Sequence, residues 1–376
     1  MNDRGRPLAV VEKVKSLLIY YSNRFLAGKH DAMINCAFGE IFRDFARLKD
    51  VGEHKDTQIG LIAQSSFTED TVLRYHFLAY PNSYYDFKPT KDYVLDGFLK
   101  PTLRDKQGDS DELASEIESY VGDLKQFVAS FLSFIEMVHT DPWCFKLCCI
   151  LGMSTHLYPL AIRLQERQLL DKTLKNETLS FSDLLEIADI RIYKTRGTDP
   201  VRDVCYLARD SRKASPRKIW NRLGELVRWF MDDSLFELNL TRGMYGNEAL
   251  LHLLITAGED WAMSHSRGSY SVEELIQLMQ TNPTIDHIFA QDPRFTFPSR
   301  GFSSADEYTN MNDHLGNLTV LEKSLNSRCQ NKLPTDKIKE PQLSKRSQGS
   351  GSLKRPETSS FSASGAIAAT SSDQTS

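Results

Sequence analysis

The amino-acid sequence predicts a mainly α-helical protein with a multi-helical body, a small ββα unit near the carboxyl end and a disordered tail. Apolar residues recur at three- and four-residue steps through much of the chain, which is typical of amphipathic helices, and alternation with a period of two is scarce before residue 284. The segment from Pro341 to Ser376 is dominated by Ser, Thr, Gly and Ala. Such a segment buries too little apolar surface to fold.

The first expected helix follows an amino-terminal loop that ends at Pro7. From Val10 to Tyr21 the apolar positions are separated by Glu, Lys and Ser, which leaves one apolar face. Similar patterns predict further helices at 31–48, 113–139, 143–171, 181–190, 216–236 and 246–263.

Composition excludes several classes of protein. The most apolar window, Trp143 to Leu164, contains Lys146 and Arg163, so it is expected to form a buried helix pair and not a membrane span. The amino terminus lacks the apolar core of a signal peptide. The six cysteines form no CxxC pair, which indicates reduced, mostly buried thiols and a cytoplasmic protein.

Basic residues are concentrated locally, since the formal net charge of the whole chain is −4. Between residues 191 and 228 there are eleven Lys or Arg and only four Asp or Glu. This stretch has two interpretations. It either binds backbone phosphates or forms a solvated surface that pairs internally with acidic residues near Asp232, Asp233 and Glu237.

The sharpest chemical signal lies between Thr284 and Lys332. Asp286 and His287 are neighbours in a short β-like run, so their side chains are expected on opposite faces of a strand. A second strand is predicted at 316–321, followed by a helix at 322–333 that Pro334 ends. Together these elements form a compact ββα unit.

At these positions the sequence resembles the HNH, or ββα-metal, nucleases, and more closely the carboxy-terminal nuclease domain of the GmrSD-type modification-dependent restriction endonucleases. The resemblance rests on three short motifs and on the nine-residue spacing from Asn317 to Asn326. The motifs are Asp286-His287-Ile288, Gly316-Asn317-Leu318-Thr319, and Asn326 with Asn331-Lys332.

The resemblance implies a role for each matching residue. His287 and Asn317 are the expected catalytic residues, with His287 as the general base and Asn317 holding the His287 ring or the intervening loop. Asp286 and Asn326 are the expected ligands of one divalent ion, Mg²⁺ or Mn²⁺. Lys332 and Arg328 are expected to contact DNA or phosphate. The resemblance gives His314 no fixed role, and three interpretations of it remain open: a contact to DNA or phosphate, a metal ligand or acid, and a purely structural residue.

The resemblance also extends to the organisation of the chain. Asn2-Asp3-Arg4-Gly5 is similar to a segment late in the amino-terminal domain of the family, whose NTP-hydrolysing part is expected to be mostly missing here. The implied domains are the helical end of a truncated ParB-like amino-terminal domain at 1–110, a helical middle domain at 111–280, an HNH ββα-metal module at 281–338 and the Ser/Thr-rich tail at 339–376. Ala290 departs from the family, which often has Pro there.

Two functions from different classes remain open at this point. The first is an Mg²⁺-dependent HNH-type DNA endonuclease of a restriction system against modified foreign DNA, with DNA as its partner and a separate subunit as a potential source of the NTPase domain. The second is a non-catalytic, truncated remnant that acts as a helical DNA-binding or partner-binding protein. The nuclease resemblance favours the first.

Overall fold

The computed structural model describes residues 8–80, 93–265 and 268–340. The expected amino-terminal loop before Leu8 and the tail from residue 341 lie outside the described residues. The chain divides into two compact units, Met1–Phe230 (unit 1) and Met231–Ser376 (unit 2), and each is described by itself. The described residues are mainly helical with one two-stranded sheet, which confirms the predicted fold class.

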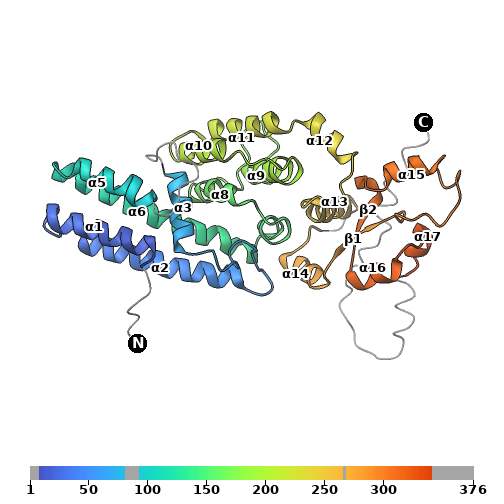
Figure 1. Cartoon of the computed structure of the whole chain (residues 1–376), viewed down its shortest axis with the longest axis horizontal. Helices are drawn as coiled ribbons and strands as arrows, with labels where there is room; N and C mark the ends of the chain where they lie inside the picture. Colours follow the sequence, from blue (N-terminus) through green and yellow to red (C-terminus); the bar gives the residue numbers. More distant parts are fainter. Residues whose placement is uncertain (1–7, 81–92, 266–267, 341–376) are drawn as a thin grey trace, which may run out of the picture. The chain divides into compact units, whose positions relative to one another are not determined.

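Unit 1 is helical throughout its described part (Figure 1). Its α-helices are α1 (Val10–Leu26), α2 (Asp31–Glu53), α3 (Glu69–Ala79), α5 (Lys100–Lys106), α6 (Ser110–Glu136), α7 (Pro142–Phe145), α8 (Tyr158–Glu166), α9 (Phe181–Ala188), α10 (Val201–Ser211) and α11 (Pro216–Phe230). Shorter π- and 3₁₀-helical segments are η1 (Val94–Leu99), η2 (Met137–His139), η3 (Lys146–Leu151), η4 (Thr155–Leu157) and η5 (Asp189–Thr195).

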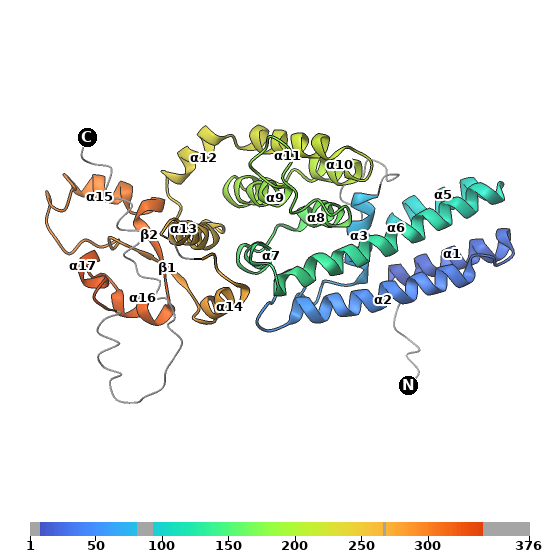
Figure 2. The ribbon, with the colours of Figure 1, turned by 180° about the vertical axis from the view of Figure 1, so that it is seen from behind.

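The long helix α6 organises the core of unit 1. It packs along α2 and against α8, and α8 in turn packs on α10 (Figure 2). The side chains of Ile117, Leu124 and Phe131 on α6 are buried at the spacing that its sequence pattern predicts. The Asp109 carboxylate caps the helix by accepting hydrogen bonds from the N–H groups of Asp111 and Glu112.

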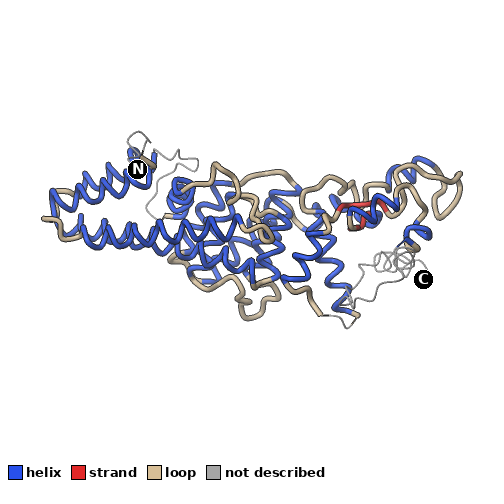
Figure 3. Tube along the Cα trace, turned by 90° about the horizontal axis from the view of Figure 1, so that it is seen from below, coloured by secondary structure: helices blue, strands red, loops and turns tan. Residues whose placement is uncertain are grey.

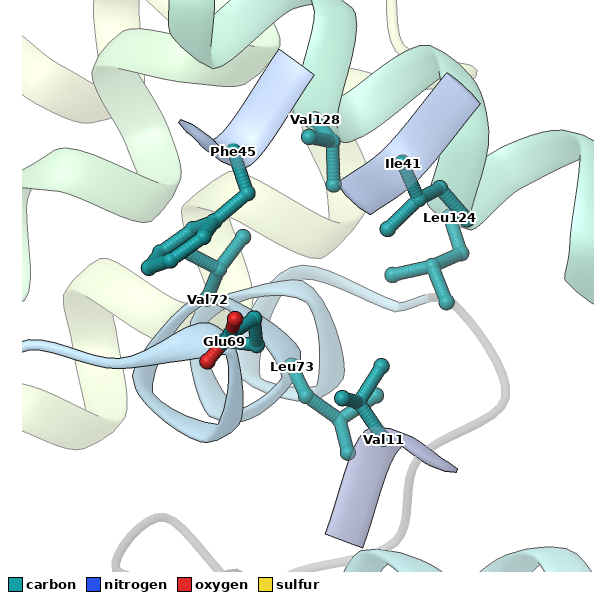
Figure 4. Close-up of a pocket in the computed structure, with 8 residues that line it drawn as sticks. All are labelled: Val11, Ile41, Phe45, Glu69, Val72, Leu73, Leu124 and Val128. Carbon is teal, nitrogen blue, oxygen red and sulfur yellow. The ribbon is translucent and has the colours of Figure 1, made fainter. Parts of the chain in front are cut away.

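A small apolar cavity lies between α1, α2, α3 and α6 (Figure 4). Its volume is about 10 Å³, which is roughly the space of one water molecule. The cavity is lined by Val11, Ile41, Phe45, Glu69, Val72, Leu73, Leu124 and Val128. It is a packing defect of the helical core and has no room for a substrate.

A buried charged cluster joins α3, α6 and α8. The Asp123 carboxylate accepts hydrogen bonds from Arg163 (Nη2 to Oδ2, 2.7 Å) and from His76 (Nε2 to Oδ2, 2.9 Å), and these three side chains have no exposed surface. Arg212 approaches Asp123 Oδ1 to 3.0 Å from the partly exposed side. Burial lowers the pKa of His76, so the neutral ring donates to Asp123 and the two arginines balance the carboxylate charge.

The basic stretch 191–228 is partly neutralised within unit 1. Besides Arg212, Arg217 pairs with Glu177 and Arg222 pairs with Asp210. Internal pairing is therefore present, although these three pairs use acids other than the ones expected from the sequence. Such pairs at the surface contribute little to stability.

The segment 143–171 forms the expected helix pair, because the φ of +68° at Gly152 ends α7 and η3 before α8 begins. One helix predicted as continuous is interrupted. The helix predicted at 216–236 ends at Phe230. A new helix, α12, follows because Asp232 caps it by accepting a hydrogen bond from the Leu235 N–H.

Unit 2 contains the one sheet of the described residues (Figure 3). Its elements are the helices α12 (Asp233–Leu240), α13 (Leu250–Ser264), α14 (Val272–Gln280), α15 (Ala305–Met311), α16 (Lys323–Cys329) and α17 (Pro334–Lys337), the 3₁₀ turn η6 (Leu315–Asn317), and the strands β1 (Thr284–His287) and β2 (Leu318–Leu321). The strands are antiparallel, with Asp286 opposite Thr319 and His287 opposite Leu318. Met244, Leu250 and Leu318 form a buried apolar cluster beneath the sheet.

The predicted ββα order is present, with different ends. The second strand begins at Leu318 because the preceding residues form η6. The helix predicted to reach Leu333 ends at Cys329, because Gln330 takes a φ of +41° that a helix cannot continue through. Pro334, expected to end that helix, instead begins α17, where its missing N–H is tolerated.

The division at Met231 differs from the sequence-based domain limits at 110, 280 and 338, which remain predictions. In the part of the chain that the structure describes, no helix is long and apolar enough to cross a membrane.

Candidate active site

His287 lies at the end of β1 and is held by a carboxylate. Its Nε2 is 3.0 Å from Oδ1 of Asp313, which lies between α15 and β2. A carboxylate only accepts hydrogen bonds, so Nε2 carries the proton of the neutral ring and Nδ1 is left able to accept one. The His287 side chain is 8% exposed and that of Asp313 is 49% exposed, so the pair lies at the surface of the unit with its imidazole sheltered.

A glycine-flanked turn, residues 243–246, covers the same pair. Gly243 and Gly246 have φ values of +120° and +92°, which only glycine adopts readily, and they bend the chain between α12 and α13. Within the turn, the Met244 N–H donates to the Asp313 carbonyl at 2.6 Å. The Tyr245 ring lies 4.5 Å from the His287 ring, centroid to centroid. The turn therefore fixes Asp313 and covers one side of the imidazole.

Asn317 contacts the loop and not the imidazole ring. Its Oδ1 accepts from the Phe289 N–H at 2.7 Å, and its Nδ2 donates to the carbonyls of Phe289 (3.0 Å) and Asn312 (2.9 Å). Of the two contacts expected from the sequence, the structure has the one to the loop. Ala290, at the position of the family's Pro, is also anchored, because the buried Tyr308 hydroxyl donates to its carbonyl.

Asp286 and Asn326 lie on the same side of β1. Asn326 Nδ2 donates to Thr284 Oγ1 at 2.9 Å, and Thr284 and Asp286, two residues apart on a strand, share a face. Helix α16, which carries Asn326, packs against β1, which carries Asp286. The fold therefore places the two expected metal ligands on neighbouring elements.

Lys337, which sequence reasoning did not single out, contacts Asp286 directly. Its Nζ lies 2.6 Å from Asp286 Oδ2 and also donates to the His287 carbonyl. Lys337 is the last residue of α17 and is 7% exposed. A buried ammonium needs such acceptors, because burial without them is costly.

The oxygen atoms of Asp286 and Asn326 suit a hard cation that takes only a few ligands from the protein. Asp286 offers a carboxylate, and the Asn326 bond to Thr284 uses its amide nitrogen, which leaves its amide oxygen for a ligand role. No group of three His, Cys, Asp or Glu suited to a metal occurs among the described residues. One carboxylate and one amide oxygen suit Mg²⁺, which keeps several waters and takes substrate oxygens, better than a metal that needs a full protein cage.

The three residues expected to contact phosphate form no hydrogen bond with the side chains of His287 or Asp313 among the described contacts. Lys332 forms an ion pair with Glu340 at 2.5 Å, and Arg328 is exposed in the last turn of α16. His314 directly precedes η6 as its cap residue, and its carbonyl accepts from the Asn317 N–H at 2.9 Å. In the Asp313-His314 pair it is thus Asp313 that contacts His287.

One feature of the sequence could have pointed to a missed residue, Tyr245. Tyr245 stands between two glycines in Gly243-Met244-Tyr245-Gly246, a pattern that predicts a tight, exposed turn. Asp313 was noted only as the neighbour of His314. Nothing local distinguishes Lys337 from the other lysines of its segment, because its partner is 51 residues away in the sequence.

Residues 250–351 match the family model of the GmrSD restriction endonucleases, C-terminal domain. The match confirms the resemblance for this region and supports a restriction-endonuclease role as a nuclease. His287, Asp313, Asn317 and Lys337 lie inside the matched range, and Tyr245 lies just before it. Neither the curated proteins nor the solved structures include a match to the chain.

Proposed function

We propose that the chain is an Mg²⁺- or Mn²⁺-dependent HNH-type DNA endonuclease that hydrolyses phosphodiester bonds in a restriction system against modified foreign DNA. The observation that carries the proposal is the contact between His287 and Asp313 (3.0 Å). His287 lies on the same strand as Asp286, and all three residues lie within the range that matches the nuclease family. The nuclease module is assigned to residues 281–338.

His287 acts as the general base of this reaction. Nδ1 takes a proton from the water that attacks the scissile phosphate, as the water oxygen bonds to phosphorus and the bond to the leaving oxygen breaks. The Asp313 carboxylate keeps the ring oriented through Nε2 and stabilises the imidazolium that forms. Asn317 holds the loop after β1, and Tyr245 shields one side of the ring.

Asp286 and Asn326 would hold the divalent ion, which would stabilise the negative charge that develops on the phosphate. Lys332, Arg328 and His314 contact the DNA backbone. Backbone contacts carry no information on base sequence, so they position the DNA without selecting a site. A partner subunit that supplies an NTPase domain, and a cytoplasmic location, belong to the same proposal.

Cleavage of supercoiled plasmid tests the proposal. Purified protein is incubated with plain and hydroxymethylcytosine-containing plasmid in Mg²⁺ or Mn²⁺, and the nicked and linear forms are separated on gels. We expect metal-dependent nicking that excess EDTA abolishes, because removing the ion removes the charge stabilisation at the phosphate. Absence of nicking on every substrate, with metal still bound, would favour the non-catalytic DNA-binding or partner-binding alternative.

Replacing Asp313 by Asn tests its positioning role. Asp313→Asn keeps the size of the side chain but removes the charge that stabilises the imidazolium and the preference for a proton on Nε2, so we expect kcat for nicking to fall by about 10²- to 10⁴-fold. The KM for plasmid should stay unchanged, because the proposed mechanism gives Asp313 no contact with DNA. Single-turnover and multiple-turnover assays separate the two constants.

Asp306→Asn is the matched control for this variant. Asp306 is an exposed carboxylate in the first turn of α15, so its replacement removes the same charge from the same unit without touching His287. Equal nicking rates for Asp313→Asn and Asp306→Asn would rule out the positioning role.

A further inference from the structure

The ammonium group of Lys337 lies at the carboxylate that the proposed function assigns to the metal ion. Nζ is 2.6 Å from Asp286 Oδ2, and the Asp286 side chain is 13% exposed, so little of this carboxylate is left to water. The His287 carbonyl accepts a second hydrogen bond from the same Nζ. The Lys337 ammonium group therefore contacts both residues of the Asp286-His287 pair.

The backbone of α17 keeps Lys337 in this place. The Lys337 N–H donates to the Leu333 carbonyl at 2.9 Å, and Pro334 fixes the first turn of the short helix. The neighbouring lysine, Lys339, pairs instead with Asp336 at 3.2 Å and has a side chain that is 65% exposed. Of these two lysines, Lys337 is the one directed at the metal-ligand carboxylate.

An ammonium group and a divalent cation both bind the negatively charged oxygen atoms of a carboxylate. Asp286 carries one negative charge, which Lys337 already balances. A divalent ion beside it brings a like charge close to Nζ in a sheltered site, where repulsion is screened less than at the surface. Both cations cannot be held at Asp286 Oδ2 without a loss of affinity for one of them.

We propose that Lys337 competes with the divalent cation for Asp286 and thereby sets the metal affinity of the site, so that cation binding requires Nζ to leave Oδ2. This inference rests on the proposed function, because it takes Asp286 as a metal ligand. It gives Lys337 a role that is distinct from phosphate contact. The consequence is a weak metal site that is filled only at high cation concentration.

Calorimetric titration of the DNA-free full chain with MnCl₂ tests this competition. We expect Lys337→Met to bind Mn²⁺ at least about tenfold more tightly than the unmodified protein, because the competing charge is gone. Lys339→Met is the matched control and should leave the dissociation constant unchanged. Lys337→Gln, which keeps a hydrogen-bond donor for the His287 carbonyl, should bind as Lys337→Met does and replaces it if the Met variant does not fold.

Two further variants separate failure of this inference from failure of the proposed function. Asp286→Asn and Asn326→Ala should both weaken Mn²⁺ binding. If they do so while Lys337→Met and Lys337→Gln bind Mn²⁺ no more tightly than the unmodified chain, the competition is refuted and the metal site stands. If Asp286→Asn leaves Mn²⁺ binding unaltered, the metal assignment of the proposed function is refuted, and the inference falls with it.

Discussion

Replacing His287 by Ala is expected to abolish detectable plasmid cleavage. Removal of a general base lowers a rate by typically 10²- to 10⁴-fold, and in the proposed mechanism no other side chain takes the proton from the attacking water. Asp313 is not positioned to replace it, because Asp313 lies on the Nε2 side of the His287 position, whereas the attacking water of the proposed mechanism lies on the Nδ1 side. Initial rates of nicking in Mg²⁺, measured over a wide range of protein concentration, give the size of the loss.

Loss of activity in this variant must be separated from loss of structure. His287 is buried and packs against Tyr245, so His287→Gln, which retains a polar side chain, is measured in parallel with His287→Ala. His265→Ala is the control, because His265 is exposed on the same unit and packs on Trp261. Circular dichroism should be the same for all three. Cleavage by both His287 variants at the rate of the control would refute the general-base assignment.

The sequence predicted several helices that have one exposed and one buried face, but it did not predict α10 and α14, which also have one buried face. In α1 and α6 the apolar residues follow the helical period because one side of each helix faces the core. Helix α3 was not predicted, since it is buried almost all round and its burial extends over polar Asp70 and His76. A helix of this kind has no amphipathic period to detect. Its existence depends on tertiary packing.

The residues at which helices begin and end were harder to predict from the sequence than the presence of the helices. The breaks before α12 and after α16 depend on the cap at Asp232 and on the backbone of Gln330, and neither alters the apolar pattern. Such ends are decided by a few hydrogen bonds and dihedral angles, which a period of apolar residues does not report.

The residues of the candidate site also differ in how far the sequence could predict them. The motif residues Asp286, Asn317 and Asn326 could be selected from the sequence because they match short motifs of a nuclease family that lie within its matched range. Asp313 and Lys337 reach the Asp286-His287 pair from 26 and 51 residues away, through side-chain contacts that follow no spacing rule. Their contribution becomes visible only in the folded unit.

Replacing Asp123 by Asn is expected to destabilise unit 1 by about 3–5 kcal/mol, because it removes the fully buried carboxylate partner of Arg163 and leaves only the less buried Glu166 to pair with this guanidinium. Asn keeps the size of the side chain, so the loss reports charge and not a cavity. Urea unfolding at pH 7, followed by circular dichroism, measures the change. Asp105→Asn is the control, because the Asp105 side chain is 75% exposed, and its effect should stay within about 0.5 kcal/mol.

The pH dependence of this difference tests its electrostatic origin. Burial by itself raises the pKa of Asp123, but the hydrogen bonds from His76 and Arg163 and the charge of Arg163 outweigh it and hold the pKa well below its usual range. A carboxyl whose pKa is lowered on folding stabilises the folded state above its unfolded pKa, roughly 4, and loses that stabilisation as the pH falls toward the folded value. The gap between the unmodified protein and Asp123→Asn should therefore be full at pH 7 and shrink below about pH 4. A gap that stays constant from pH 7 to pH 3 would mean that the variant acts through packing, and that the charge of Asp123 does not hold α3, α6 and α8 together.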